Sequence, residues 1–266
     1  MRSRIQIARP RVEAVKTLLR PVVRPARLYL SWLVKFAFAR GPLTIADYID
    51  YFALRNRRLF FVQIGACDGV ANDPIHRWAR LDRWSGILVE PVAGNMRKLK
   101  ENYKGQSRLI FEEVAIAESS GTKTFYQLAS PDHALPEWTA QLGSFERKTI
   151  LSHRTVLPDI DQYLVGAEVR TLTLRDLLKK HGVHRFELML VDCEGYDFAV
   201  VKQIGSLASP PSVIVYEHVH MADPSECANF LSNLGYRSLR FATDTLAYRE
   251  GVFPNRLIRN AAVSQV

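Results

Sequence analysis

The sequence predicts an α/β fold in which helices cover both faces of a doubly wound, mostly parallel sheet. Short apolar runs with aromatic and β-branched residues, such as Leu59–Ile64 and Phe186–Val191, are typical of strands buried on both faces. Segments with helical apolar spacing alternate with these runs, which favours parallel strands joined by crossover helices. Several runs end in acidic residues, at the strand ends where open parallel sheets bind their ligands.

Five strands of this sheet are expected in order along the chain, followed by a closing hairpin. The expected strands lie near residues 59–64, 86–90, 109–115, 186–191 and 212–216. The expected helices lie near residues 73–81, 92–104, 174–181, 196–204 and 223–234. Residues 236–241 and 245–248 have the spacing of a two-stranded hairpin.

The first expected strand leads directly into a glycine-containing turn, Gly65–Gly69, and the second delivers Glu90 at its end. Glycines let a ligand approach the backbone, and an acid at this distance accepts hydrogen bonds from a ribose diol, so the pattern fits an adenosine-bearing cofactor. A dinucleotide fingerprint needs three glycines, whereas this turn has two, and Asp68 would repel a pyrophosphate. The turn therefore favours S-adenosylmethionine, which has a cationic end, over NAD. A tight turn without a ligand is the alternative.

Two further expected strands end in polar clusters. Asp192 and Glu194 follow the strand near 186–191, and Glu217, His218 and His220 follow the strand near 212–216. Carboxylates at the ends of buried strands are costly to desolvate without a function, and in such sheets they face the ligand crevice. The alternative is a capping role, with Glu194 at the start of the next helix and Asp197 in its first turn.

These pieces, in this order, resemble the FkbM-type S-adenosylmethionine-dependent methyltransferases over roughly residues 59–250. Two positions depart from the family pattern, since Gln63 stands where an acid is usual and Cys67 where asparagine is common. The matching pieces are Ile64-Gly65-Ala66, Asp68-Gly69, Glu90-Pro91, Leu99, Asn102, Ala115-Ile116, Gly121, Leu172-Thr173-Leu174, Leu177, Asp192, Glu194-Gly195 and Glu217.

The resemblance implies a seven-stranded, Rossmann-like methyltransferase sheet with an antiparallel C-terminal edge hairpin. It also implies S-adenosylmethionine as the cofactor. The cofactor-binding residues expected from it are Gly65, Ala66, Asp68, Gly69, Glu90, Glu113, Ala115 and Asp192.

The resemblance further implies an oxygen acceptor, a hydroxyl on a glycan, a lipid-linked molecule or a secondary metabolite. A hydroxyl is a weak nucleophile at neutral pH, so it needs a base or a metal. The expected catalytic residues are Asp192, Glu194 and His218, and only one of His218 and His220 should reach the acceptor because alternate strand residues face opposite ways. Metal-independent chemistry is preferred. The alternative is Mg²⁺ bound by Asp192, Glu194 and Glu217 with His218 or His220. The competing hypotheses are a non-catalytic methyltransferase-like scaffold and an NAD-dependent oxidoreductase.

Residues 117–170 interrupt the alternation of strands and helices. They contain several glycines and prolines together with Trp138, Phe145, His133 and His153. Inserted loops of this length near a crevice are usually functional or disordered. We interpret this insertion as the lid that binds the methyl acceptor.

Three parts of the chain are expected: a basic helical N-terminal extension at residues 1–58, the methyltransferase domain that the resemblance implies at 59–255, and a C-terminal tail at 256–266. Residues 1–60 hold 13 Lys and Arg against 3 acidic residues, whereas the other 206 residues hold 23 against 24. The three cysteines have neither metal-ligand nor disulfide spacing, which favours a reducing, cytoplasmic setting.

The extension is expected to form two helices, near residues 12–20 and 26–39. Its apolar run is shorter than the roughly 20 residues of a membrane span. Three interpretations stay open: it packs on the catalytic domain, contacts an anionic membrane surface through residues 1–40, or binds a partner chain. No recognition motif accompanies the charge, so nucleic acid is not expected as a partner.

Overall fold

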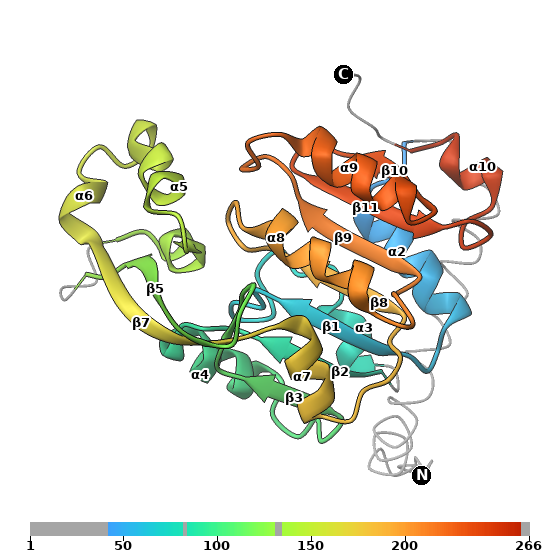
Figure 1. Ribbon diagram of the computed structural model, residues 1–266, viewed down its shortest axis with the longest axis horizontal. Helices are drawn as coiled ribbons and strands as arrows, with labels where there is room; N and C mark the ends of the chain where they lie inside the picture. The colour runs from blue at the N-terminus through green and yellow to red at the C-terminus, as the bar shows by residue number, and fades with distance from the viewer. Residues whose placement is uncertain (1–41, 82–83, 131–134, 262–266) are drawn as a thin grey trace, which may run out of the picture. The chain divides into compact units, whose positions relative to one another are not determined.

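The computed structural model describes residues 42–81, 84–130 and 135–261 (Figure 1). The two helices expected in the basic extension lie outside these ranges, as does His133. The compact unit to which the described residues belong begins at Pro42.

A seven-stranded mixed sheet is the framework of the described chain, in the order β10-β11-β9-β8-β1-β2-β3 (Figure 1). Five neighbouring strands run parallel, and β11 is antiparallel to both β9 and β10. The predicted α/β class, the seven strands and the antiparallel hairpin are confirmed. The strands are β1 (Phe60–Ile64), β2 (Ser85–Val89), β3 (Leu109–Glu112), β8 (Leu188–Val191), β9 (Val213–Glu217), β10 (Tyr236–Arg240) and β11 (Asp244–Arg249).

Helices cover both faces of this sheet because successive strand residues point to opposite sides. Val62 and Ile64 of β1 pack in one buried cluster with residues of α7, α8 and α9, which lie in front of the sheet in Figure 1. Phe61 points the other way and contacts Trp84, which stacks on Trp78 of α3. The helices are α2 (Ile45–Arg55), α3 (His76–Leu81), α4 (Ala93–Asn102), α7 (Leu174–Lys180), α8 (Asp197–Val201) and α9 (Pro224–Asn233).

Helix α2 was not predicted from the sequence. It belongs to the same compact unit as the main sheet and contacts α3 and α10. Thr44 and Asp47 form a capping box at its N-terminus, which satisfies two of the free backbone N–H groups there. The Tyr48 hydroxyl donates a 2.6 Å hydrogen bond to the carbonyl of Leu257 in α10 (Asn255–Ile258). Asp50 accepts a 2.8 Å hydrogen bond from the indole N–H of Trp78. The segment that leads into β1 is thereby fixed to the back of the sheet.

Residues 117–170 do not form an irregular loop, which corrects the prediction for this segment. They form most of a second sheet in the order β4-β7-β5-β6, in which β5 and β7 pair antiparallel over eight residues. A small core of Leu142, Ile150 and Ile160 lies beside this sheet. The elements are β4 (Ala115–Ile116), β5 (Gly121–Leu128), η1 (Glu137–Gln141), β6 (Gly143–Ser144), α5 (Arg147–Leu151), η2 (Ser152–Thr155), α6 (Ile160–Tyr163) and β7 (Leu164–Leu172).

The expected strand near 109–115 is divided between the two sheets. β3 ends at Glu112, and Ala115–Ile116 pairs with β7 of the second sheet. The chain therefore leaves the main sheet at this point and returns to it through α7. The insertion is joined to the main sheet through two short connections.

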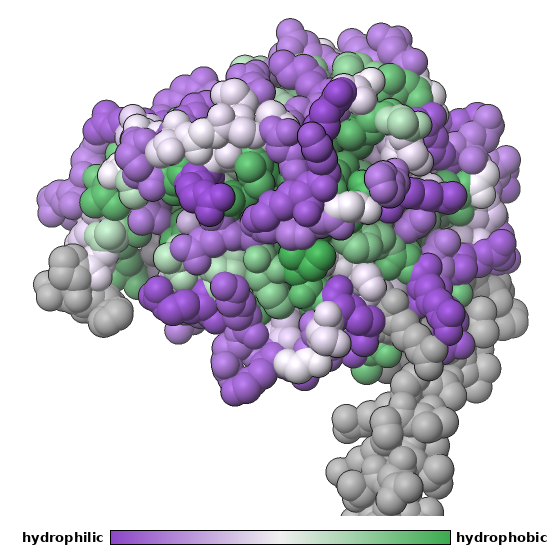
Figure 2. All heavy atoms as spheres, turned by 60° about the horizontal axis from the view of Figure 1, so that its bottom comes forward, coloured by the Kyte–Doolittle hydropathy of each residue, from purple (hydrophilic) through white to green (hydrophobic). Residues whose placement is uncertain are grey.

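The described surface carries few large apolar side chains. On the face drawn in Figure 2, hydrophilic residues predominate and hydrophobic ones form smaller areas between them. Across the described ranges, no helix combines the length and the apolar character that crossing a membrane requires. The exposed large hydrophobic residues are Val70, Leu81, Trp138, Val156, Val165 and Val219.

Candidate active site

A cavity of about 880 Å³ lies at the carboxyl ends of β1, β2, β8 and β9. The turn after β1 contributes Gly65, Ala66 and Cys67, and the insertion contributes Phe125 and Phe145. The strand ends also bring Glu90, Asp192, Glu194 and Glu217 to its wall, as the sequence predicted. An open parallel sheet offers its ligand site at this edge.

The turn after β1 is held against the end of β8 by a glycine. Gly65 has a φ of +77°, and a Cβ at this position would lie 1.8 Å from the carbonyl oxygen of Asp192. Its N–H and that of Ala66 both donate to the carbonyl of Val89, each at 3.0 Å. Only glycine fits this combination of left-handed backbone and close approach.

Cys67, which stands where asparagine is common in the family, also has a left-handed backbone. Cys67 has a φ of 45°, a conformation that asparagine adopts more readily than most residues. Burial raises the pKa of its thiol to about 12, with Glu90 as the next cause, so the side chain stays neutral. Cys67 thus keeps the shape of the turn without adding a charge to the cavity.

Glu90 is 5% exposed and organises the loop around it. Its Oε2 accepts from the N–H of Cys67 and its Oε1 from the N–H of Val92, each at 2.9 Å. Burial is the largest cause that raises the pKa of this carboxyl to about 7, although these hydrogen bonds oppose it. The Asn95 side chain also hydrogen-bonds to this carboxylate, which has about four acceptor sites, so Glu90 can still accept from a ligand hydroxyl while holding the loop.

Three residues expected to bind the cofactor lie outside the cavity wall. The Asp68 carboxylate accepts from the N–H groups of Val70 and Ala71, at 2.8 and 2.9 Å, so it stabilises the turn itself. A Cβ on Gly69 would lie 2.5 Å from Leu99 of α4, so this glycine serves packing. Glu113 is exposed, whereas Ala115 lines the cavity as expected.

Two polar residues, Gln63 in β1 and Asp73 in the loop after it, were not assigned a role from the sequence. Gln63 lines the cavity, and its side chain hydrogen-bonds to the carboxylate of Asp73, which also lines it. Gln63 Oε1 is buried without a hydrogen-bond partner. Burial raises the pKa of Asp73 to about 6. The family usually carries an acid at the strand position of Gln63. In this chain the Asp73 carboxylate, from the loop after the strand, lies beside the Gln63 amide instead.

The far side of the cavity holds more carboxylates than it can keep ionised together. Asp192 is exposed to the open cavity. Desolvation by the protein around it raises the pKa of its carboxyl to about 6, and repulsion by Asp244 is the second cause. Burial raises the pKa of Glu194 to about 8 and that of Glu217 to about 10, with Asp192 the next cause for both. Such a cluster favours a proton or a cationic ligand among its members.

Asp197 has the structural role that the alternative interpretation gave it. It is the first residue of α8 and is fully buried. Its carboxylate accepts from the N–H groups of Cys193 and Gly195, at 3.2 and 3.3 Å. These contacts shape the turn in which Glu194 has a φ of 48°. Glu194 itself caps no helix, so its side chain is free to face the cavity.

His218 does not lie on the cavity, which corrects its assignment as a catalytic residue. It is 3% exposed, and both ring nitrogens are engaged. Its Nε2 accepts from Arg240 Nε at 2.9 Å, and its Nδ1 faces Thr245 Oγ1 at 3.1 Å. Neither nitrogen is left for an acceptor, so His218 supports the hairpin at the sheet edge.

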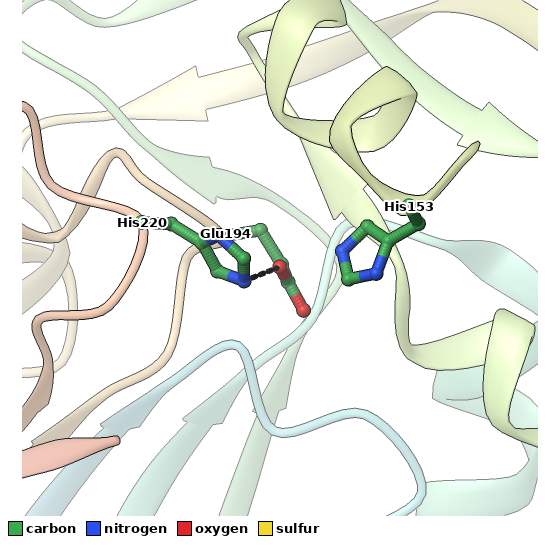
Figure 3. A group of neighbouring side chains, drawn as sticks. All are labelled: His153, Glu194 and His220. Atoms are coloured by element: carbon green, nitrogen blue, oxygen red, sulfur yellow. Dashed lines mark ion pairs between the residues drawn. The ribbon is translucent and has the colours of Figure 1, made fainter. Parts of the chain in front are cut away.

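His220, like His218, is not part of the cavity wall, but it contacts Glu194, which is. Its Nε2 lies 3.5 Å from Glu194 Oε2, and its ring centroid lies 5.5 Å from that of His153 in the insertion. Burial lowers the pKa values of both histidines, and their proximity lowers that of His220 further. Figure 3 shows Glu194 between the two rings.

An aromatic wall closes the cavity on the side of the insertion, and only Phe145 among its residues was named from the sequence. Phe145 contacts Phe125 and Tyr196 edge to face, at centroid distances of 5.3 and 4.9 Å. The Lys123 ammonium lies 4.4 Å from the Phe145 ring and 4.7 Å from the Tyr196 ring. The second sheet thus contributes apolar surface, as expected of an acceptor-binding segment.

Comparison with known proteins gives a family match and similar solved structures. Residues 63–238 match the family model of the methyltransferase FkbM domain. A methyltransferase FkbM from Methylobacillus flagellatus KT shares 11% identity, with 85% of this chain and 60% of that chain covered and a TM-score of 0.44. An O-methyltransferase from Bacillus cereus in complex with SAH shares 11% identity, with 89% and 97% covered and a TM-score of 0.40. No curated protein matches at a significant level.

Proposed function

Since the chain belongs to the FkbM methyltransferase family, we propose that it transfers a methyl group from S-adenosylmethionine to a hydroxyl of its acceptor. The acceptor is a glycan, a lipid-linked molecule or a secondary metabolite. The chain spans 60% of the length of the FkbM structure from Methylobacillus flagellatus that it resembles.

The observation that carries this proposal is Glu90, buried beside the Gly65 turn with both carboxylate oxygens directed by backbone N–H groups. An acid at the end of the second strand suits the two hydroxyls of a ribose, and the glycine turn suits the close approach of the cofactor. The cationic sulfonium and ammonium groups suit the carboxylates across the cavity. Among these, Asp192 holds the amino end of the cofactor.

Methyl transfer to oxygen is an in-line displacement. The hydroxyl oxygen forms a bond to the methyl carbon, the carbon–sulfur bond breaks, and its electron pair stays on the sulfur of the departing cofactor. The hydroxyl proton must leave at the same time, and positioning supplies much of the remaining rate enhancement. Glu194 with its neighbour His220 activates the acceptor hydroxyl.

Binding and label transfer test this proposal separately. Isothermal titration of the full-length protein should detect S-adenosylhomocysteine and not NAD. Methyl-labelled S-adenosylmethionine should then label an acceptor fraction from cell extract, with Glu90→Ala as the matched inactive variant. Methyl ethers survive alkaline hydrolysis, whereas methyl esters release methanol. Label that is lost in alkali would exclude a hydroxyl acceptor, and the absence of cofactor binding would favour a scaffold.

A further inference from the structure

Three side chains with metal-binding donor atoms meet at the edge of the cavity (Figure 3). His153 comes from η2 of the insertion, Glu194 from the turn after β8, and His220 from the loop after β9. One donor atom of each lies within 4.8 Å of the other two. Figure 3 shows the His153 ring directed toward Glu194 from the side opposite His220.

Two of these donor atoms are buried and unsatisfied. Glu194 Oε2 and His153 Nε2 are shielded from solvent and have no hydrogen-bond partner. Unpaired buried polar atoms are rare because each loses its hydrogen bond to water without replacement. The two atoms belong to the same cluster, so a single bound ion would satisfy both.

The spacing also fits an ion better than a hydrogen bond. Glu194 Oε2 and His220 Nε2 are 3.5 Å apart, which is longer than a good hydrogen bond. Neighbouring ligands on a tetrahedral ion with bonds of about 2.1 Å lie about 3.4 Å apart. The 4.8 Å limit on the other pairs requires closure by at most about 1.4 Å, which side-chain rotation supplies.

We propose that His153, Glu194 and His220 bind one divalent ion of the zinc class. Two imidazoles and one carboxylate suit first-row transition ions, whereas Mg²⁺ and Ca²⁺ prefer oxygen ligands alone. Three protein ligands leave a coordination position open, as in catalytic zinc sites. The site differs from the Mg²⁺ alternative that the sequence suggested, because Asp192 and Glu217 are not among the ligands.

Whether the ion binds does not depend on the proposed function, but the role of the ion in methyl transfer rests on that function. Glu194 lines the cavity, whereas His153 and His220 are not part of its wall, so this role requires that the open position of the ion face the cavity beside Glu194. A Lewis acid lowers the pKa of a bound hydroxyl, so in this role the ion takes over the activation of the hydroxyl from Glu194 and His220, and the hydroxyl proton leaves to solvent water before or during transfer. The oxygen then attacks the methyl carbon and the sulfur keeps the electron pair. No oxidation state changes, so no further reactant is needed.

Metal titration of the full-length protein tests the site without an acceptor. The protein, freed of its affinity tag and stripped of metal, should bind one Zn²⁺ per chain, and Co²⁺ should give visible absorption bands that Zn²⁺ abolishes. His153→Ala, Glu194→Gln and His220→Ala should each weaken binding at least about 100-fold, since even second-layer changes cost 10–100-fold. His184→Ala, at an exposed histidine, is the matched control and should bind as the wild type does.

Three outcomes separate the site from the proposed function. Stoichiometric binding that the three variants keep would overturn the site, as would wild-type protein that binds no Zn²⁺. The variants should retain wild-type circular dichroism, and Glu194→Gln preserves side-chain volume, so its loss of metal cannot reflect a cavity. Titration with S-adenosylhomocysteine runs in parallel: its failure in the wild type would refute the cofactor assignment and leave the metal result standing.

Discussion

Replacement of Glu90 by alanine is the most direct test of the cofactor site. The wild-type carboxylate accepts hydrogen bonds from the N–H groups of Cys67 and Val92 and from the Asn95 side chain, and it retains acceptor capacity for a ligand hydroxyl. Glu90→Ala removes the hydrogen-bond partner of the ribose and leaves the two loop N–H groups without an acceptor. The cofactor should therefore lose both its anchor and part of the ordered loop.

The size of the loss in affinity follows from the negative charge of Glu90 as a hydrogen-bond acceptor. Hydrogen bonds to a charged group contribute about 1.5–3 kcal/mol, so the dissociation constant for S-adenosylhomocysteine should rise about tenfold to 150-fold. Isothermal titration at pH 8 measures it directly, because the Glu90 pKa of about 7 leaves the wild-type carboxylate mostly ionised there. Circular dichroism at the same pH checks that the variant is folded.

Glu113→Ala is the matched control for this experiment. Glu113 is also a glutamate at the carboxyl-terminal edge of the sheet, but it is exposed and lies outside the cavity wall. Its removal should leave the dissociation constant unchanged. Equal affinity of folded Glu90→Ala and wild type would refute the assignment of the ribose to Glu90.

Three further predictions concern stability. Gly65→Ala places a Cβ 1.8 Å from the Asp192 carbonyl oxygen, so it should lower the free energy of unfolding by more than about 3 kcal/mol in denaturant titrations; a smaller loss would mean that the turn can move. Burial raises the Glu90 pKa from 4.5 to about 7, so the stability linked to its proton is fully present below pH 4.5 and lost as pH rises through 7. Glu90→Gln, which has no such proton, should therefore gain stability relative to wild type between pH 5 and pH 8, and a constant difference would contradict the linkage. His218→Ala should cost about 1–3 kcal/mol, because its side-chain partners lose their acceptor or donor, yet bind S-adenosylhomocysteine as tightly as wild type. Weakened binding by that variant would restore His218 to the site.

The main sheet was predictable because its strands are buried on both faces. Runs such as Leu188–Val191 are apolar throughout, and few other structures tolerate such a run at that length. Strands β5 and β7 lack this signal, since most of their residues are exposed or half-buried and many are polar. Their pairing is decided by contacts between segments about 40 residues apart, which local pattern does not report.

The site was predictable where it depends on strand ends and not where it depends on distant segments. Glu90 and Asp192 each follow a strand and Glu217 is the last residue of one, so the topology alone brings them to one edge. His153 reaches Glu194 only through the fold of the insertion, and nothing in its neighbourhood along the chain indicates this. The choice between His218 and His220 depended on where β9 ends, because the chain turns after Glu217 and no longer alternates.

The base of the second sheet has a consequence for how this chain could acquire new substrates. Gly121 and Thr171 pair across the first rung of β5 and β7, so the whole insertion enters and leaves the domain at adjacent positions. A segment whose ends already meet can be replaced by another of different length with little added loop-closure entropy. Phe125, Phe145 and His153 belong to that segment, whereas the Gly65 turn and Glu90 lie outside it. Recombination at these two adjacent positions would exchange the segment proposed to bind the acceptor and leave the proposed cofactor site intact.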